Sequence, residues 1–320
     1  MSKIQDLRRY ELVFTTSCAY THGVSGHLYE LIDYFHIAST NGIKSAILLT
    51  DGITYDLLEQ SILDKYNFTE AERNNILDNT IECYRPKIVT TQNICIVDGS
   101  WRLGDCTVFA NNAFLLRCSE DDFTYFDKHK TIKRTHLMQD FKLYPERFEN
   151  LNITVVDYVK KILWQKYHQP SQVKTGTALF YLTSNCRALP PEDIKLVMDK
   201  YRHDKYLIVT NNTALYKSLQ SETVEIAKVP VQNIFDKFDT YIYTKIIVPP
   251  MWGMNRIEDC SPRFIVECAA FGKNVIYDLD YVDRGVECRR AAIENDIMAL
   301  QLTSEDYFID YVKQQIHTNN

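Results

Sequence analysis

Arg263 and Glu267 lie one helical turn apart in the mainly apolar stretch PRFIVECAAFG, within residues 259–279, which read DCSPRFIVECAAFGKNVIYDL. Ser261 and Pro262 predict the start of a helix, since serine caps helices and proline fits their first turn. Arg263 and Glu267 then share one helix face. Arg263 at the positive helix end suits an anion, and a carboxylate among apolar residues needs donors such as the hydroxyls of a sugar diol. The alternative is a plain salt bridge between the two side chains.

The segment THGVSGH, residues 21–27, is a glycine-containing loop between an expected strand and an expected helix. Backbone N–H groups and the helix dipole at such a turn can face an anion. Gly23, Ser25 and Gly26 are therefore candidate anion-binding residues, and a histidine such as His22 can orient or protonate an oxygen. The full dinucleotide-binding and P-loop fingerprints are absent, so a plain strand-to-helix turn is the alternative.

The segment TSNCR, residues 183–187, directly follows the expected strand ALFYL. Polar residues at the carboxyl end of a strand suit a phosphate. The hydroxyls of Thr183 and Ser184 would position it, and the guanidinium of Arg187 would bind it through two hydrogen bonds. The alternative is an exposed surface arginine.

Three residues at or near the ends of expected strands are candidates for a general base, namely His22, Asp51 and Asp98. Such a base removes the proton from an attacking hydroxyl. Asp98 opens the sequence DGSWR, in which Trp101 and Arg102 suit base stacking and phosphate contact. The alternative for Asp98 is an ordinary turn aspartate.

The segment PRFIVECAAFGKNVIY resembles the E-x-x-x-x-G-x-x-V helix-to-strand segment in the nucleotide-sugar domain of GT-B-type glycosyltransferases, with Glu267, Gly272 and Val275 on the motif. The resemblance implies that Glu267 holds the ribose hydroxyls of a sugar nucleotide. It also implies that Arg263 and the helix N-terminus neutralise the diphosphate, with Arg187 as second cation. The loop HGVSGH resembles the glycine loop that closes on donor and acceptor in the same fold. The implied activity is sugar transfer from a UDP-type nucleotide sugar, without a further cofactor or a bound metal.

The segment DRGVECRR, residues 283–290, resembles the D-G-x-x-x-R pattern of a phage-encoded branch, although Arg284 separates Asp283 from Gly285. Some phage-encoded glycosyltransferases decorate hydroxymethylated pyrimidines in DNA. The resemblance therefore implies 5-hydroxymethylcytosine in DNA as the acceptor, with glucose or a pentose such as arabinose as the sugar. The alternatives are a saccharide or small-metabolite acceptor, or a non-catalytic nucleotide-binding protein.

A basic and aromatic segment, residues 127–148, has weak periodicity and is expected to be a long loop or a region that orders on a ligand. Its cations are candidates for contact with the DNA backbone. They are Lys128, Lys130, Lys133 and Arg134. A solvated loop with no partner is the alternative.

Alternating strand and helix patterns predict an α/β chain with two Rossmann-like doubly wound domains facing a cleft. Strands are expected at 10–16, 45–50, 93–99 and 107–118, and the first helix from Leu28. The acceptor-side domain is expected at 1–168 and the nucleotide-sugar domain at 175–300. The helix in 301–320 can cross back onto the first domain.

Composition limits the function classes. The 320 residues are 45% hydrophobic and 24% charged, as in an ordinary globular protein. The net charge of −6 argues against a generally basic nucleic-acid binder but leaves room for a local basic groove. No apolar run is long enough for a membrane span, and the N-terminus lacks the apolar core of a signal peptide. Nine dispersed cysteines indicate reduced thiols in the cytoplasm, of the host cell if the protein is phage-encoded.

Overall fold

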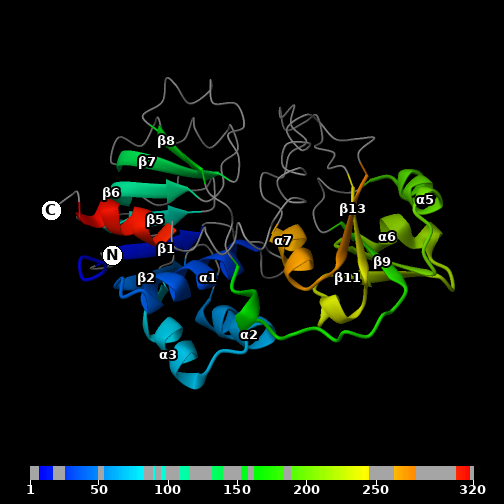
Figure 1. Cartoon of the computed structure of the whole chain (residues 1–320), viewed down its shortest axis with the longest axis horizontal. Helices are drawn as coiled ribbons and strands as arrows, with labels where there is room; N and C mark the ends of the chain where they lie inside the picture. The colour runs from blue at the N-terminus through cyan, green and yellow to red at the C-terminus, as the bar shows by residue number, and fades with distance from the viewer. Residues whose placement is uncertain are drawn as a thin grey trace. The chain divides into compact units, whose positions relative to one another are not determined.

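The computed structural model divides into two units. The first comprises Met1–His168 and Ala299–Asn320, and the second comprises Gln169–Met298 (Figure 1). The structure describes residues 7–16, 26–49, 54–82, 89–90, 95–98, 108–115, 132–139, 153–157, 162–182, 189–244, 263–278 and 308–317.

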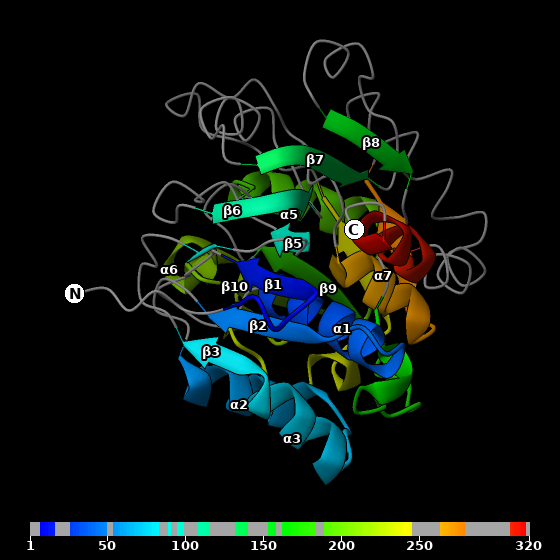
Figure 2. The ribbon, with the colours of Figure 1, turned by 90° about the vertical axis from the view of Figure 1, so that its left-hand side faces the viewer.

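The first unit contains an eight-stranded sheet with the strand order β3-β2-β1-β5-β6-β7-β8, and β4 pairs with β6. Every one of these pairings is parallel. Figure 2 shows the order from β3 to β8. The strands are β1 Leu12–Thr16, β2 Ser45–Leu49, β3 Thr80–Glu82, β4 Val89–Thr90, β5 Cys95–Asp98, β6 Val108–Leu115, β7 Ile132–Gln139 and β8 Ile153–Asp157. The chain winds outward from β1 to β3 and then resumes at β5 on the other side of β1, which makes the sheet doubly wound.

The first helix packs on this sheet and has a clear stop signal. It begins at Gly26 rather than at Leu28, and Phe35 meets Phe14 of β1 edge-to-face at 6.3 Å between ring centroids. After α1, Gly42 adopts φ +79°. The Ile43 N–H donates to the Ala38 carbonyl and the Gly42 N–H to the Ser39 carbonyl, which is the Schellman pattern. The helices here are α1 Gly26–Thr40, α2 Tyr55–Lys65, α3 Glu70–Asp78 and the short 3₁₀ helix η3 Trp164–Lys166.

The expectation of a long loop at residues 127–148 is wrong for 132–139. These residues form β7, which pairs with β6 on one side and with β8 on the other. Its sequence IKRTHLMQ has no continuous apolar run, so local pattern does not reveal it. Ladder pairing with two neighbours decides the conformation instead.

A helix at residues 308–317 belongs to the first unit (red in Figure 1). Its buried positions Phe308, Ile309, Val312 and Ile316 recur at helical spacing. The ring of Phe308 lies 4.8 Å from that of Tyr34 in α1. The helix therefore fills part of the core that α1 begins.

Residues 166–168, which directly precede the second unit in the chain, contact α1 and the region of α2. The Asp33 carboxylate in α1 is fully buried and accepts hydrogen bonds from Tyr66 at 2.9 Å and Tyr167 at 2.8 Å. The Asn67 N–H donates to the Lys166 carbonyl, and the His168 N–H donates to the Lys65 carbonyl. These contacts hold residues 166–168 on the first unit, directly before the chain enters the second.

The second unit contains a five-stranded sheet with the order β11-β10-β9-β12-β13, again parallel throughout. Its strands are β9 Thr177–Leu182, β10 Lys205–Thr210, β11 Val224–Lys228, β12 Thr240–Tyr243 and β13 Asn274–Tyr277. Its helices are α5 Pro191–Lys200, α6 Thr213–Tyr216 and α7 Arg263–Ala270, with 3₁₀ helices η5 Lys217–Leu219 and η6 Ile234–Asp236. The α/β class with two doubly wound parallel sheets, predicted from the alternating pattern, is confirmed.

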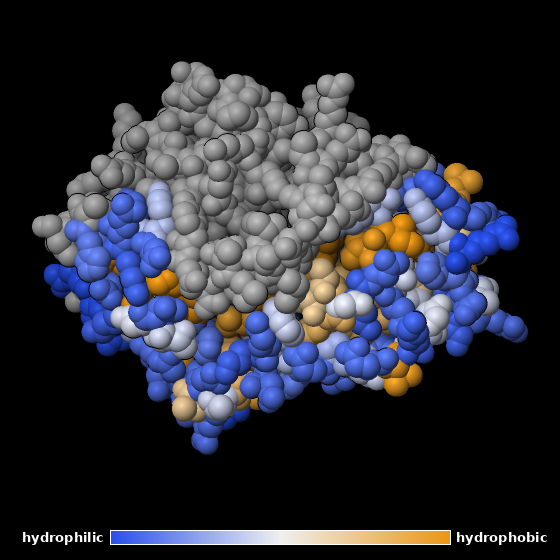
Figure 3. All heavy atoms as spheres, viewed as in Figure 1, coloured by the Kyte–Doolittle hydropathy of each residue, from blue (hydrophilic) through white to orange (hydrophobic). Residues whose placement is uncertain are grey.

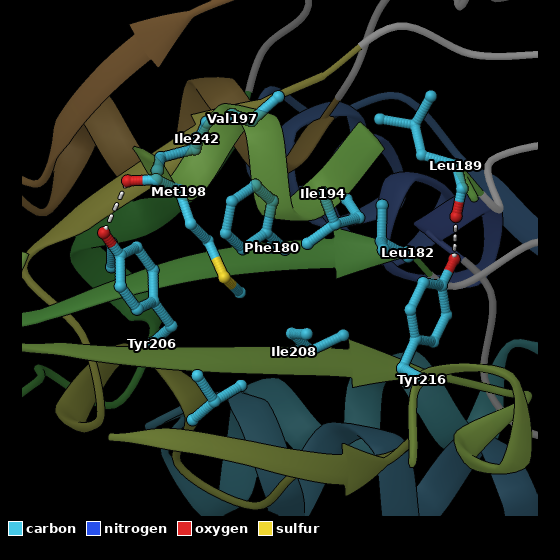
Figure 4. Packing of buried hydrophobic residues seen from close by; sticks show 12 residues of the cluster. Phe180, Leu182, Leu189, Ile194, Val197, Met198, Tyr206, Ile208, Tyr216 and Ile242 are labelled. Carbon is cyan, nitrogen blue, oxygen red and sulfur yellow. Dashed lines mark hydrogen bonds between the residues drawn. The ribbon is translucent and has the colours of Figure 1, made fainter. Parts of the chain in front are cut away.

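Each face of this second sheet carries a separate core. Phe180, Ile208 and Ile242 point to one face, where side chains of α5 cover them (Figure 4). Two tyrosines close this core, since the Tyr206 hydroxyl donates to the Met198 carbonyl and the Tyr216 hydroxyl to the Leu189 carbonyl, each at 3.0 Å. Leu179, Leu207 and Tyr241, at alternate positions of the same strands, pack on the opposite face with residues of α7.

Within the described ranges, no helix combines the length and the apolar character that crossing a membrane requires. On the face in Figure 3, the coloured surface is mainly hydrophilic and is interrupted by a few apolar patches. Large exposed apolar side chains among the described residues are scattered, as is normal. They are Leu63, Val173, Leu196 and Leu215.

Glu72 joins α3 to the end of the first unit. Its carboxylate accepts from the Thr69 N–H at 2.8 Å and from Lys166 Nζ at 2.6 Å, and the Thr69 hydroxyl accepts from the Glu72 N–H, which completes a capping box. Burial by itself would raise the pKa of Glu72. The hydrogen bonds from Lys166 and Thr69 outweigh burial and lower the pKa from 4.5 to about 2.

We predict that Glu72→Gln lowers the free energy of unfolding at pH 7 by about 1–2 kcal/mol, since the charged hydrogen bonds that the carboxylate accepts from Lys166 and Thr69 are lost, although glutamine still fits the capping box. Because the folded pKa lies below the unfolded pKa, this contribution is complete above about pH 4.5 and disappears as the pH falls towards about 2. Urea unfolding across that range measures it. Glu70→Gln, an exposed carboxylate in the same helical turn, is the control. A Glu72 effect that stays constant down to pH 2 would contradict the prediction.

Candidate functional site

In the first unit the strand order reverses between β1 and β5, and ligands of doubly wound sheets bind at the carboxyl ends of strands around such a point. Asp98 is the last residue of β5, and its backbone pairs opposite Thr15 near the carboxyl end of β1. Thr16 at the end of β1 pairs opposite Leu49 at the end of β2. Three adjacent strands therefore end at one edge of the sheet.

The predicted residues of this unit relate to that edge through the chain. Gly26 is the first residue of α1. The segment that contains His22, Gly23 and Ser25 follows β1, and Asp51 follows β2, but all four lie outside the described residues. The structure thus describes Gly26 and the backbone of Asp98 among the residues predicted here.

The predicted acceptor residues fall into two groups. Trp101, Arg102, Lys128 and Lys130 lie outside the described residues. Lys133 and Arg134 are part of β7, and Arg134 pairs opposite Asn112, which itself pairs opposite Cys95, the first residue of β5. Arg134 is therefore level with the amino end of β5, whereas Asp98 stands at its carboxyl end.

In the second unit the order reverses between β9 and β12. The predicted phosphate residues Thr183, Ser184 and Arg187 follow β9 and lie outside the described residues, as does Ser261 before α7. The helix α7 itself is described. It lies between β12 and β13 in the chain, so its N-terminus belongs to the carboxyl edge of the sheet.

An aromatic stack fixes the position of that N-terminus. Phe264, in the first turn of α7, stacks on Tyr181 near the carboxyl end of β9, with centroids 4.4 Å apart and ring planes 2° from parallel. Phe235 of η6 also stacks on Phe264, with centroids 5.1 Å apart and ring planes 20° from parallel. The first turn of α7 therefore lies against the end of β9, directly before residues 183–187.

The sequence pattern does not predict this stack. Tyr181, Phe235 and Phe264 are distant in the sequence and each reads as ordinary core. The available signal was the aromatic residue at the carboxyl end of the strand ALFYL, because that end of a parallel strand faces the ligand edge of the sheet.

Arg263 and Glu267 form a buried ion pair on α7. Arg263 Nε donates to Glu267 Oε1 at 2.7 Å, and the two side chains are 5% and 4% exposed. A salt bridge between these two side chains is the alternative that the sequence pattern allows. This salt bridge is present, and it is buried. Removing both charges from water costs free energy that their attraction and hydrogen bonds must offset, so the pair is a costly feature in an apolar helix.

The rest of α7 holds this pair in place. Ile265 and Cys268 pack into the core against the sheet. The helix ends at a Schellman motif in which the Lys273 N–H donates to the Cys268 carbonyl and Gly272 adopts φ +67°. Both ends of the eight-residue helix are therefore fixed, one by ring stacking and the other by the glycine turn.

Metal ligands do not gather in the described structure. In the part of the chain that it covers, no three or more His, Cys, Asp or Glu side chains are arranged to hold a metal ion.

Known structures resemble this chain in fold. The crystal structure of the pneumococcal O-GlcNAc transferase GtfA, in complex with UDP and GlcNAc, aligns with a TM-score of 0.52 at 7% identity, over 97% of this chain and 96% of that chain. The chain has the GT-B fold, with two Rossmann-like domains. A glycosyltransferase from Rickettsia africae aligns at a TM-score of 0.44, 12% identity, 96% of this chain and 93% of that one.

A third structure, TarM, aligns at a TM-score of 0.40 and 9% identity over 70% of this chain, which spans about half (51%) of the TarM chain. Because the TarM and Rickettsia africae alignments both score below 0.5, the fold assignment rests on GtfA. The sequence matches no protein-family model and no curated protein.

Burial raises the pKa of the Cys268 thiol well above its ordinary value of 9, and the neighbouring Glu267 charge adds to this. We predict that iodoacetamide at pH 8 leaves Cys268 unmodified in the folded protein, since the thiolate is the reacting form. Peptide mass spectrometry before and after unfolding in guanidinium measures the modification. Rapid labelling of Cys268 in the folded protein would contradict the buried position of α7.

Proposed function

We propose that the protein transfers a sugar from a nucleotide sugar to an acceptor hydroxyl. The observation that carries the proposal is the buried Glu267, held by Arg263 on a helix whose first turn lies at the carboxyl end of β9. A protein that needs only a stable core gains nothing from such a pair, because apolar residues of similar volume serve equally well or better. A carboxylate kept at a ligand edge is suited to bind a diol.

The donor side is proposed to work as follows. Glu267 accepts hydrogen bonds from the ribose hydroxyls. The helix N-terminus with Ser261, and the loop residues Thr183, Ser184 and Arg187, meet the diphosphate. Negative charge develops on the diphosphate as the glycosidic bond breaks. The guanidinium of Arg187 and the backbone N–H groups of the helix N-terminus are proposed to stabilise this charge. Gly23, Ser25 and Gly26 are proposed to contact the donor, as the resemblance of their loop implies.

A uridine diphosphate donor is the proposed class. The GtfA structure, which shares the fold, contains UDP and GlcNAc. In the transfer step the acceptor oxygen forms a bond to the anomeric carbon, the bond to the diphosphate oxygen breaks, and UDP leaves with that electron pair. In an inverting transfer a general base takes the acceptor proton, whereas a retaining transfer does not require this base.

The base is proposed to be one of His22, Asp51 and Asp98. Each follows or ends one of the adjacent strands β1, β2 and β5, whose carboxyl ends meet at one edge of the sheet. Single alanine substitutions that all leave turnover intact would eliminate this set.

We predict that the protein binds UDP and that Glu267→Gln weakens binding about 10- to 100-fold, the worth of hydrogen bonds to a charged acceptor. Isothermal titration with UDP, ADP and GDP measures the affinities. Asp278→Asn is the matched control in the same unit, since Asp278 is also buried and pairs with Lys200 at 2.9 Å. Its nucleotide affinity should equal that of the wild type. Failure of the wild type to bind any nucleotide would reject the proposed function.

The acceptor is proposed to be 5-hydroxymethylcytosine in DNA, and the sugar glucose or a pentose such as arabinose. The likeness of residues 283–290 to a phage-encoded branch motivates this choice, and the reaction would take place in the cytoplasm of the host. Trp101 and Arg102, which follow β5, are proposed to meet the displaced base. Lys128, Lys130, Lys133 and Arg134 are proposed to meet DNA phosphates. Because Arg134 is level with the amino end of β5, the phosphate that it meets would lie away from a nucleobase at the carboxyl end of β5.

We predict that incubation with UDP-glucose or a UDP-pentose adds the sugar mass to hydroxymethylated DNA and leaves unmodified DNA unchanged. Digestion to nucleosides and mass spectrometry measure the product. Donor turnover on saccharides or small metabolites, with neither DNA changed, would reject the DNA acceptor and keep the glycosyltransferase. Nucleotide binding without turnover on any acceptor would favour a non-catalytic nucleotide-binding protein.

A further inference from the structure

The position of Arg263 at the start of α7 suggests contact with a diphosphate. Its hydrogen bond to Glu267 indicates a different role. We propose that Arg263 is a positioning residue: it holds the Glu267 carboxylate for a ribose diol and does not itself bind the diphosphate. This inference rests on the proposed function and assigns the two charges of α7 to one subsite, which selects ribonucleotides over deoxyribonucleotides.

The contact with Glu267 sets the direction in which the Arg263 guanidinium lies. Arg263 is the first residue of α7, and its Nε donates to a carboxylate one turn further towards the C-terminus. This contact holds the guanidinium along the helix instead of extending it beyond the first turn. A diphosphate at the helix N-terminus would lie beyond the first turn, where the backbone N–H groups point.

Breaking the contact between Arg263 and Glu267 would cost free energy. Both residues are at least 95% buried, and their helix neighbours Ile265 and Cys268 are buried in the core. If Arg263 moved to a phosphate, the Glu267 carboxylate would lose the cation beside it while still buried, which is strongly unfavourable. An exchange of partners during binding would therefore oppose nucleotide affinity.

A carboxylate such as that of Glu267 can accept more than one hydrogen bond. A carboxylate has about four acceptor positions on its two oxygens, so the contact with Arg263 Nε alone does not fill them. Pairing with Arg263 is therefore compatible with accepting from two neighbouring hydroxyls. The contact also restricts the Glu267 side chain before a ligand binds, which lowers the entropy cost of binding a diol.

The neighbouring stack supports a fixed subsite. Phe264 follows Arg263 and stacks on the rings of both Tyr181 and Phe235. The backbone at the start of α7 is therefore anchored to the sheet. A rigid helix that carries a rigid ion pair is built to recognise one geometry, such as a cis-diol, and not to follow a flexible diphosphate. The cation for the diphosphate then comes from outside α7, with Arg187 as the proposed residue.

Two affinity ratios separate the roles. The ribose ratio compares 2′,3′-dideoxy-UDP with UDP, and the phosphate ratio compares uridine with UDP. Titration calorimetry of the wild type, Glu267→Gln and Arg263→Met gives both ratios. We expect a wild-type ribose ratio on the order of 10–100. It should fall to within about threefold of 1 in both variants, while the phosphate ratio stays at its wild-type value.

Other results overturn the proposal. Loss of the phosphate ratio in Arg263→Met, with the ribose ratio kept, would mean direct contact with the diphosphate. Equal weakening of all three ligands would mean a purely structural role. Lys200→Met is the matched control, since it removes the cation beside Asp278, another buried carboxylate in the described part of this unit, and both its ratios should match the wild type.

The neutral double variant Arg263→Met/Glu267→Gln keeps the test decisive if Arg263→Met does not fold. It leaves neither a buried cation nor a buried anion, so we expect it to fold as judged by circular dichroism. We expect it to keep the wild-type phosphate ratio and lose the ribose ratio, and loss of both would overturn the proposal. Absence of UDP binding by the wild type would instead reject the proposed function itself.

Discussion

A buried carboxylate must have a cation or several donors beside it, and this requirement shapes the ligand edge of the second unit. Glu267 and Arg263 satisfy it within one turn of α7 at 2.7 Å. Breaking such a pair typically costs about 3–5 kcal/mol, a large share of the stability of a domain. The helix that carries the pair therefore has to be held rigidly, and the ring stack on Tyr181 and the glycine turn after Ala270 do this.

Parallel pairing gives both units the same design. In each sheet the order reverses beside the first strand, β1 in one unit and β9 in the other. Residues that follow neighbouring strands then converge on one edge although they are far apart in the chain. For this reason the predicted donor-binding and base residues, from His22 to Glu267, lie at the end of a strand, on segments that follow strands, or on the helices that begin after them, whereas Lys133 and Arg134 lie within β7.

Local signals in the sequence were enough for the elements whose ends are coded by nearby residues. The helix α7 has a proline before it and Gly272 after it, and α1 stops at Gly42. Both glycines adopt positive φ, as the pattern requires. Strand β7 was missed because its residues lack an apolar run and its conformation depends on pairing with β6 and β8. The partners of Phe264 were missed because they come from other elements, which spacing within one segment does not reveal.

The return of residues 308–317 to the first unit bears on how the protein is made. Phe308 occupies the core beside Tyr34, yet the whole second unit is synthesised between them. At about 5–20 residues per second, a ribosome needs roughly 7–28 s for the 140 residues from His168, where the first segment of this unit ends, to Phe308. During this time the nascent first unit lacks the helix that covers Tyr34, while the second unit, continuous in sequence, can fold by itself. The emerging chain would thus expose apolar surface that a chaperone can hold, until the last helix arrives.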